Sequence, residues 1–386
     1  MYNSKYKFFN YCVFLCLLSF LLTPCVRAAE PFKGDIYTLL NYIRIHKAVL
    51  DYRNIEKQGG WAKLPYDKVL RKGDISNDIA LLKKRLYMTG DLNYYHKNNS
   101  NIFDDKLYKA VKLFQWRHGL IPDGIAGPTT IKTLNIPVSD KLSQLEMNQS
   151  KIYNLFEDYI DSYILVNIPE YRLRVVEDGE EILNMKTIVG KKYSKTPIFH
   201  EELEYIVLNP TWRIPIKKVV LEIIPKIKKD PEYLKRKNIK VFDGWDDKAV
   251  ELSPENIEWD NYSVDNFDLM LEQEAGKNNE LGIVKFMFPN DYLVYIHDTP
   301  YKELFSYNDR SFSSGCIRVE KPIELAEYCL KENKGWNLEK IMKIIDEEKI
   351  TKIDLVEHIP VVTVYWTSWV DEDGIVHFRK DIYNSN

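Results

Sequence analysis

The spacing of apolar residues changes along the chain, and this change restricts the folds that the sequence can adopt. In the first part they recur at helical spacing in two stripes, Ile75, Ile79, Leu82 and Leu86, then Leu107, Val111 and Phe114. From Ile164 onward apolar residues alternate with a period of two, which is typical of strands with one buried face. We therefore expect an α+β fold, with a small three-helix domain followed by a mainly antiparallel β domain.

The helical domain is expected at residues 72–136. Between its second and third helices, Asp123-Gly124 is a turn signal. Gly127 and Pro128 then suit the start of a third helix, because proline is tolerated at the first helical position.

The remaining boundaries follow from breaks in these patterns. Residues 29–71 carry a weak helical stripe and are expected to form a helical scaffold segment, the stripe being Leu39, Ile43 and His46. Gly59-Gly60 should end that helix. We expect a linker at 137–161 and the β domain at 162–386. Within the β domain Val361–Trp366 and Ile375–Phe378 predict a closing hairpin, with His377 at the surface.

The first residues have the pattern of a secretory leader. Lys5 and Lys7 precede an apolar run from Phe8 to Leu22, and small residues follow at Val26–Ala29. This order predicts a signal peptide at residues 1–28. The alternative is an uncleaved membrane anchor, although the run is short for a spanning helix. Either interpretation exports the rest of the chain, and the second leaves the leader as a membrane tether.

Charge and cysteine content exclude other classes. Lys and Arg total 54 against 57 Asp and Glu, a net charge of −3, which argues against nucleic acid as a partner. Three of the five cysteines lie in the leader, so a disulfide framework is excluded. Cys329 lies four residues after Leu325 on the helix expected after Pro322, which indicates a core position. Cys316 is then left as the candidate reactive thiol.

Residues 212–285 interrupt the β pattern with a helical or irregular insertion. A basic block around Lys226–Lys240 is followed by an acidic block around Asp243–Glu258. The two blocks are either solvated faces that attract each other or part of a lid that caps the substrate.

A histidine and a cysteine in the β domain form a candidate catalytic pair. His297 ends a predicted strand, and Cys316 follows a polar loop and the tight turn Ser313-Ser314-Gly315. A cysteine attacks a carbonyl as its thiolate, and a nearby histidine can accept the proton. If the chain is extended after the turn, Cys316 and Arg318 point to one side while Ile317 and Val319 point inward. The remaining histidines lack the spacing of a zinc site, so we expect no metal and no cofactor.

Two sets of motifs resemble known families. Phe114-Gln115, Gly119-Leu120, Asp123-Gly124 and Gly127-x-Thr129 resemble the peptidoglycan-binding domain over residues 72–136. His297-Asp-Thr-Pro followed by Ser314-Gly315-Cys316-Ile317-Arg318-Val319 resembles the L,D-transpeptidase signature. Further resemblance to the branch with a large insertion lies in Leu208–Trp212, Gly282–Phe286 and Ser368–Gly374.

The resemblance implies a function in peptidoglycan synthesis in the periplasm or cell envelope. Cys316 would be the nucleophile and His297 the proton acceptor and donor, with Ser314, Gly315, Arg318 and Tyr295 lining the pocket and the oxyanion site. The expected reaction forms a thioester on a tetrapeptide stem, releases D-alanine and makes a 3→3 cross-link to an acceptor amine. Partners would be stem peptides and glycan, and carbapenems would acylate the enzyme. The alternatives are an L,D-carboxypeptidase-type hydrolase and a non-catalytic wall-binding protein.

Overall fold

The computed structural model describes residues 36–66, 68–95, 101–156, 162–246 and 248–385. The leader expected at residues 1–28 lies outside these ranges, as does the start of the scaffold segment. Among the described residues, no helix is both long enough and apolar enough to cross a membrane.

The three-helix domain is confirmed. Its helices are α3 (Asn77–Met88), α4 (Asp105–Arg117) and α5 (Pro128–Leu134). The two predicted stripes lie in one core, in which Ile79, Leu82 and Phe114 are fully buried, except that Ile75 precedes α3 and is exposed. Asp104 caps α4 by accepting a hydrogen bond from the Leu107 N–H over 2.8 Å, which satisfies one of the free donors at a helix start.

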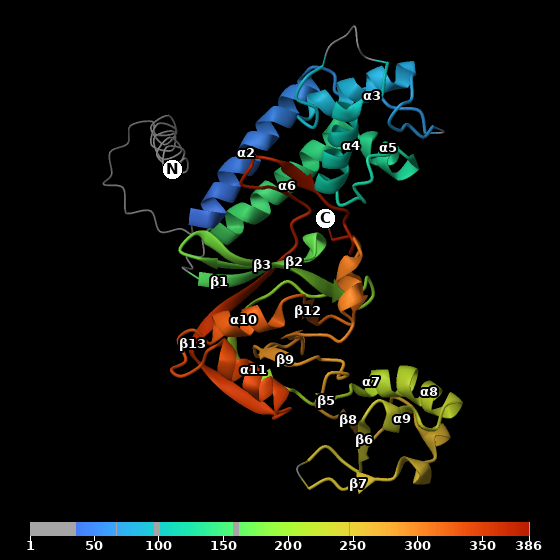
Figure 1. Ribbon diagram of the computed structural model, residues 1–386, viewed down its shortest axis with the longest axis vertical. Helices are drawn as coiled ribbons and strands as arrows, with labels where there is room; N and C mark the ends of the chain where they lie inside the picture. The colour runs from blue at the N-terminus through green and yellow to red at the C-terminus, as the bar shows by residue number, and fades with distance from the viewer. Residues whose placement is uncertain (1–35, 67, 96–100, 157–161, 247, 386) are drawn as a thin grey trace. The chain divides into compact units, whose positions relative to one another are not determined.

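Two long helices flank this domain in sequence and pack on each other (Figure 1). They are α2 (Ile36–Lys57) and α6 (Val138–Phe156), so most of the segment expected as a linker is helical. The helix in the scaffold segment ends close to Gly59, as expected, but its expected face was wrong, since Ile43 is exposed. The buried side of α2 is formed by Ile45, Val49 and Tyr52, which contact α6 and the β domain. Short apolar stripes do not identify the buried face when both sides carry aromatic residues.

The β domain is built on one nine-stranded sheet of order β11-β3-β12-β10-β9-β4-β13-β1-β2, in which β2 also pairs with β3. Its strands are β1 (Ser162–Asn167), β2 (Arg172–Glu177), β3 (Glu180–Gly190), β4 (His200–Leu208), β9 (Val284–Met287), β10 (Ile296–His297), β11 (Ser311–Ser313), β12 (Ile317–Val319) and β13 (Thr351–Val364). Most neighbours are antiparallel, while β1–β13, β10–β12 and β11–β3 are parallel. The fold class predicted from the alternation is therefore confirmed.

Helices cover both faces of this sheet. Helices α10 (Pro322–Cys329) and α11 (Leu338–Asp346) bury Leu325, Cys329 and Ile341 against one face. On the other face Leu165 and Val362 pack against α2 and α6. Each strand in that region is buried on both sides, which fixes its register.

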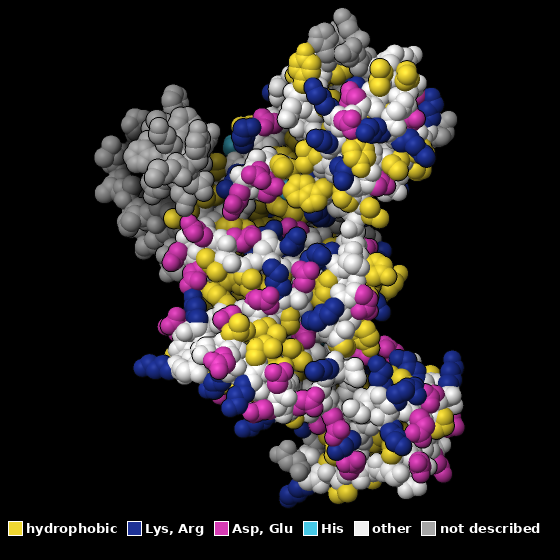
Figure 2. Space-filling model, in the orientation of Figure 1, with side chains coloured by type: hydrophobic (Ala, Val, Ile, Leu, Met, Phe, Trp, Pro, Cys, Tyr) yellow, Lys and Arg dark blue, Asp and Glu magenta, His cyan; other side chains and the backbone are white. Residues whose placement is uncertain are grey.

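The insertion forms a small unit with its own core (Figure 1). A four-stranded sheet of order β5-β8-β6-β7 packs with short helices, its strands being β5 (Trp212–Arg213), β6 (Ile239–Phe242), β7 (Glu251–Leu252) and β8 (Met270–Gln273). The helices are α7 (Ile216–Lys218), α8 (Ile224–Lys229) and α9 (Tyr233–Arg236). Lys and Arg side chains gather over α7 and α8 beside acidic ones (Figure 2). Ion pairs such as Lys228–Asp260 and Lys240–Glu251 join the basic and acidic blocks.

The closing hairpin consists of β14 (Ser368–Val370) and β15 (Val376–Phe378). The expected first arm, Val361–Trp366, lies largely in the main sheet instead, because β13 pairs with β1 and β4. His377 is buried, so its expected surface position was wrong. Its ring stacks on Trp369 at 5.0 Å, and its Nε2 atom lies 2.8 Å from an Asp371 carboxylate oxygen.

Candidate active site

Two short parallel strands carry the candidate catalytic residues. Strand β10 ends at His297, and Cys316 directly precedes β12. In the register of this pair His297 lies opposite Arg318, and the Ile317 N–H donates to the Tyr295 carbonyl over 3.0 Å. The parallel pairing therefore places Cys316 beside the strand that carries the histidine.

In these strands, apolar side chains point into the core and the candidate catalytic side chains point to the opposite face of the sheet. Ile296, Ile317 and Val319 are fully buried in the main core. Because successive side chains of a strand point to opposite faces, the residues between them share the other face. That face carries Tyr295, His297, Cys316 and Arg318.

A third strand, β9, places a second cation next to His297. Strand β9 pairs with β10 so that Lys285 lies opposite His297, while Phe286 lies opposite Ile296 in the core. The imidazole thus has Arg318 as its neighbour on one side and Lys285 on the other. Both cations are half-buried.

This environment keeps the imidazole of His297 neutral. Burial, followed by the positive charge of Arg318, lowers the pKa of His297 to about 3. Its Nδ1 atom is buried and has no hydrogen-bond partner among the described residues. The ring packs edge-on against Tyr295 with centroids 5.5 Å apart. A neutral imidazole with an unused nitrogen can accept a proton.

The thiol of Cys316 is half-buried and close to polar groups. Burial raises the pKa of this thiol above its usual value, while Tyr295, Lys285 and Arg318 oppose that rise. The Lys285 ammonium lies 4.1 Å from the centre of the Tyr295 ring, and burial lowers the pKa of this lysine. A thiolate formed here would be stabilised by two nearby cations.

A hydrogen-bonded turn holds Cys316 in place. Gly315 adopts φ = 123°, a conformation that L side chains rarely adopt. The Ser313 hydroxyl donates to the Cys316 carbonyl over 2.6 Å and accepts from the Gly315 N–H over 3.1 Å. Thr196 donates to the Gly315 carbonyl over 2.8 Å, whereas Ser314 is exposed. The Gly315 N–H is therefore already paired and does not point freely toward an oxyanion.

Asp298 fixes the strand that carries the histidine. It is buried, accepts a hydrogen bond from the Ile283 N–H over 3.0 Å and forms an ion pair with Lys302. Gly282 approaches this carboxyl group so closely that a Cβ atom would overlap it. These contacts tie the residue after His297 to the start of β9.

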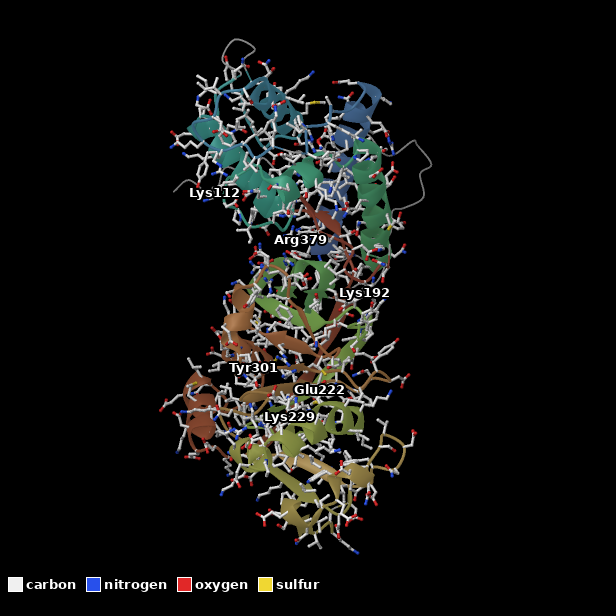
Figure 3. All side chains as sticks on the ribbon, turned by 90° about the vertical axis from the view of Figure 1, so that its right-hand side faces the viewer. Lys112, Lys192, Glu222, Lys229, Tyr301 and Arg379 are labelled. Carbon is white, nitrogen blue, oxygen red and sulfur yellow. The ribbon has the colours of Figure 1, made fainter. Side chains whose placement is uncertain are left out.

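The insertion reaches the same face of the sheet. Tyr295 packs against the core of the insertion, and a cavity of about 200 Å³ lies between the insertion and Tyr301. Figure 3 labels Tyr301 close to Glu222, a residue of the insertion that lines this cavity. The Tyr301 hydroxyl donates to Glu280 over 2.6 Å, which joins the two parts.

The structure brings together most of the residues that the sequence singled out. Cys316, His297, Tyr295 and Arg318 lie on one sheet face, and Gly315 shapes the turn. Ser314 lies at the exposed tip of that turn. Sequence reasoning missed Lys285, although it sits between Val284 and Phe286, both of which are core residues, and so had to face the other way. Its pairing with His297 depends on strand register, which the sequence did not show.

Two family descriptions match the chain. "L,D-transpeptidase catalytic domain" matches residues 161–345, and "Putative peptidoglycan binding domain" matches residues 76–134. A protein of Haemophilus influenzae named "Putative L,D-transpeptidase" is 35% identical over 344 residues, which is 85% of this chain and 67% of the relative.

Solved structures overlap less well. An L,D-transpeptidase from Mycobacterium smegmatis is 13% identical, with 53% of this chain and 58% of that chain covered and a TM-score of 0.24. An L,D-transpeptidase from Stackebrandtia nassauensis is 14% identical, with 78% and 97% covered and a TM-score of 0.27.

Proposed function

The chain belongs to the L,D-transpeptidase family and carries a peptidoglycan-binding domain N-terminal to its catalytic domain, and from this premise we propose that Cys316 is its nucleophile. The observation that carries the proposal is the parallel pairing of β10 and β12, which sets Cys316 and His297 on one face of the sheet. The other described cysteine, Cys329, is enclosed in the core.

In the first step the Cys316 sulfur attacks the carbonyl carbon at the third residue of a tetrapeptide stem. Neutral His297 accepts the thiol proton as the carbon–sulfur bond forms. The same proton then passes to the departing amine, so that D-alanine leaves and a thioester remains. Lys285 and Arg318 stabilise the negative charge that develops on sulfur and on the carbonyl oxygen.

In the second step the side-chain amine of an acceptor stem attacks the thioester carbonyl. The amine loses a proton to His297, the carbon–sulfur bond breaks, and the thiol is regenerated by that proton. The product is a 3→3 cross-link. If water attacked instead, the product would be a tripeptide stem, as in an L,D-carboxypeptidase.

The flanking parts have supporting roles in this proposal. The insertion, which packs on Tyr295 and Tyr301, would cap the bound stem and keep water from the thioester. Residues 1–28 would export the chain to the periplasm. Carbapenems, whose ring carbonyl can be attacked in the same way, would acylate Cys316.

Mass spectrometry of the purified chain tests the assignment. After incubation with a carbapenem, the adduct mass should appear on the peptide that contains Cys316. The adduct and the cross-linked product from a disaccharide-tetrapeptide should both disappear in Cys316→Ala, while Cys329→Ala, the matched control, should keep both. If Cys316→Ala retained either one, the nucleophile assignment would be wrong. A purely trimmed product would favour the hydrolase.

A further inference from the structure

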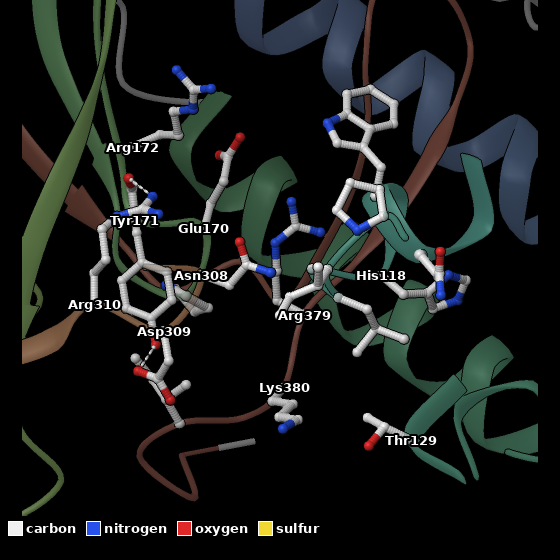
Figure 4. A pocket seen from close by; sticks show the side chains of 18 of the residues that line it. His118, Thr129, Glu170, Tyr171, Arg172, Asn308, Asp309, Arg310, Arg379 and Lys380 are labelled. Carbon is white, nitrogen blue, oxygen red and sulfur yellow. Dashed lines mark hydrogen bonds between the residues drawn. The ribbon is translucent and has the colours of Figure 1, made fainter. Parts of the chain in front are cut away.

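A second cavity, of about 600 Å³, lies away from Cys316 between the peptidoglycan-binding domain and the catalytic domain. One wall comes from the end of α4, the loop that follows it and the start of α5, including Gln115, Trp116 and Thr129. The opposite wall comes from the start of β2, the segment before β11 and the C-terminal segment after β15. Figure 4 shows Arg379 extending into the middle of this space.

The catalytic-domain side of the cavity is rich in cations. Arg172, Arg310, Arg379 and Lys380 all line it. Arg310 donates to three backbone carbonyls, those of Thr187, Tyr307 and Tyr171, and Arg379 donates to the carbonyls of Arg117 and Phe378. These acceptors are neutral, and within the described ranges no carboxylate forms an ion pair with either arginine.

The carboxylates of the same cavity are already bound by other groups. Glu170 forms a two-point ion pair with Arg174 at 2.6 and 2.7 Å. Asp309 accepts hydrogen bonds from Tyr171 and Ser311, and Asp123 accepts one from Gln115 over 2.7 Å. Five Lys and Arg side chains line the cavity against three Asp and Glu side chains, so positive charge stays in excess, although Glu170 attracts both Arg310 and Arg379.

The positive charges of these arginines also repel each other. Burial, and then the nearby charge of Arg172, lowers the pKa of Arg310 to about 10. Burial also lowers the pKa of Arg379 to about 10; Glu170 opposes this shift, while Arg310 and Arg172 add to it. An anion placed between them would relieve this repulsion and could accept paired hydrogen bonds from guanidinium groups.

We propose that this cavity is a second binding site, which holds the carboxylates of a peptidoglycan stem peptide remote from Cys316. The proposal rests on the proposed function for the choice of ligand. The volume suits a short peptide and exceeds what a single small ion needs. The facing wall supplies the exposed indole of Trp116 and the exposed hydroxyl of Thr129, which fit a peptide better than a phosphate. That wall also lies within the residues that match the peptidoglycan-binding domain.

Isothermal titration calorimetry on the full chain carrying Cys316→Ala tests this site without any chemistry. The probe is the stem tripeptide L-alanyl-γ-D-glutamyl-diaminopimelate with free carboxyl groups. In this background Arg379→Gln should raise Kd about tenfold or more, because a charge-assisted contact is lost, and Lys380→Gln at the rim about two- to threefold. Arg71 is an exposed arginine directly before the helical domain, and Arg71→Gln should leave Kd unchanged.

Further titrations distinguish this site from a phosphate site and from the active site. The tripeptide with amidated carboxyl groups should bind at least tenfold more weakly, and inorganic phosphate should not compete at equal concentration. Arg318→Gln should leave most of the binding intact, because Arg318 belongs to the active site. If Arg379→Gln lowers the melting temperature, Arg172→Gln repeats the test. Among the described hydrogen bonds the Arg172 side chain donates only to Asn184, so its loss should disturb the fold less.

The proposal is overturned if Arg318→Gln abolishes binding while Arg379→Gln and Arg172→Gln do not, since the tripeptide would then occupy the active site. It is also overturned if phosphate binds and the tripeptide does not. Because the Cys316→Ala chain is used throughout, tripeptide binding can succeed even if acylation of Cys316 fails, and the reverse also holds.

Discussion

Two thiols touch the same hydrophobic core, yet their surroundings differ. Burial raises the pKa of both Cys316 and Cys329. Around Cys329 the neighbours are aliphatic, with Leu325 and Leu330 in the same cluster. Tyr295, Lys285 and Arg318 act on the Cys316 thiol, and His297 lies on the same sheet face. Since both thiols are buried, the proposed difference in their reactivity depends on these polar neighbours.

Replacing His297, the proposed base, should have the largest effect on the reactivity of Cys316. In His297→Asn the thiol keeps its burial and its nearby cations but loses the proposed proton acceptor. We expect carbapenem acylation at Cys316 to slow by about 10²- to 10⁴-fold, the usual contribution of a general base. Stopped-flow absorbance measures the rate. His358→Gln, a histidine on the exposed part of β13, is the matched control and should acylate at the normal rate.

The pH dependence of acylation should lack the inflection of an ordinary histidine. Since the pKa of His297 is about 3, the imidazole is neutral between pH 5 and 8 and the rate should show no inflection near the ordinary histidine value of about 6.5. Below that value the unfolded chain takes up a proton that folded His297 does not. The free energy of unfolding should therefore fall as pH drops from about 6.5 toward 3. A rate inflection near 6.5 would contradict the assigned environment.

Lys285 should have an intermediate effect. Lys285→Met keeps the length of the side chain and removes the charge, so the pKa of Cys316 should rise further and acylation at neutral pH should slow about five- to fiftyfold. Iodoacetamide labelling across pH, read by mass spectrometry on the Cys316 peptide, measures the shift. The Cys329 peptide should stay unlabelled in the folded chain. Lys352→Met, an exposed lysine of β13, controls for loss of charge; an unchanged Cys316 titration in Lys285→Met would remove Lys285 from the site.

Local patterns predicted the helical domain better than the sheet. The stripes through Leu82 and Val111 and the turn at Asp123-Gly124 act over a few residues, so the sequence alone indicated all three helices. In the sheet, alternation showed which residues face inward but not which strands are neighbours. The pairing of Val361 with Ile164 instead of with the last hairpin strand depends on contacts far apart in sequence.

The same limit applies to the site. Cys316 and His297 could be proposed from the sequence because their residue types and motifs fit the chemistry. Lys285 could not, because its position opposite His297 depends on how strands β9 and β10 pair. The cavity around Arg379 is harder still to predict, since its walls come from five separate segments of the chain and no motif joins them.

The two serines of the turn give the smallest and most specific test. The motif drew attention to Ser314, but its side chain is exposed, whereas Ser313 bonds both the Gly315 N–H and the Cys316 carbonyl. Ser313→Ala should slow acylation up to about tenfold, the cost of one or two lost hydrogen bonds that fix the nucleophile. Ser314→Ala should stay within about twofold, because it removes no contact of the turn. Acylation rates of the two variants, measured side by side, decide between them. A larger loss of acylation rate in Ser314→Ala than in Ser313→Ala would mean that the exposed Ser314 hydroxyl contacts the substrate. The difference in reactivity between Cys316 and Cys329 would then depend on the bound ligand as well as on the fold.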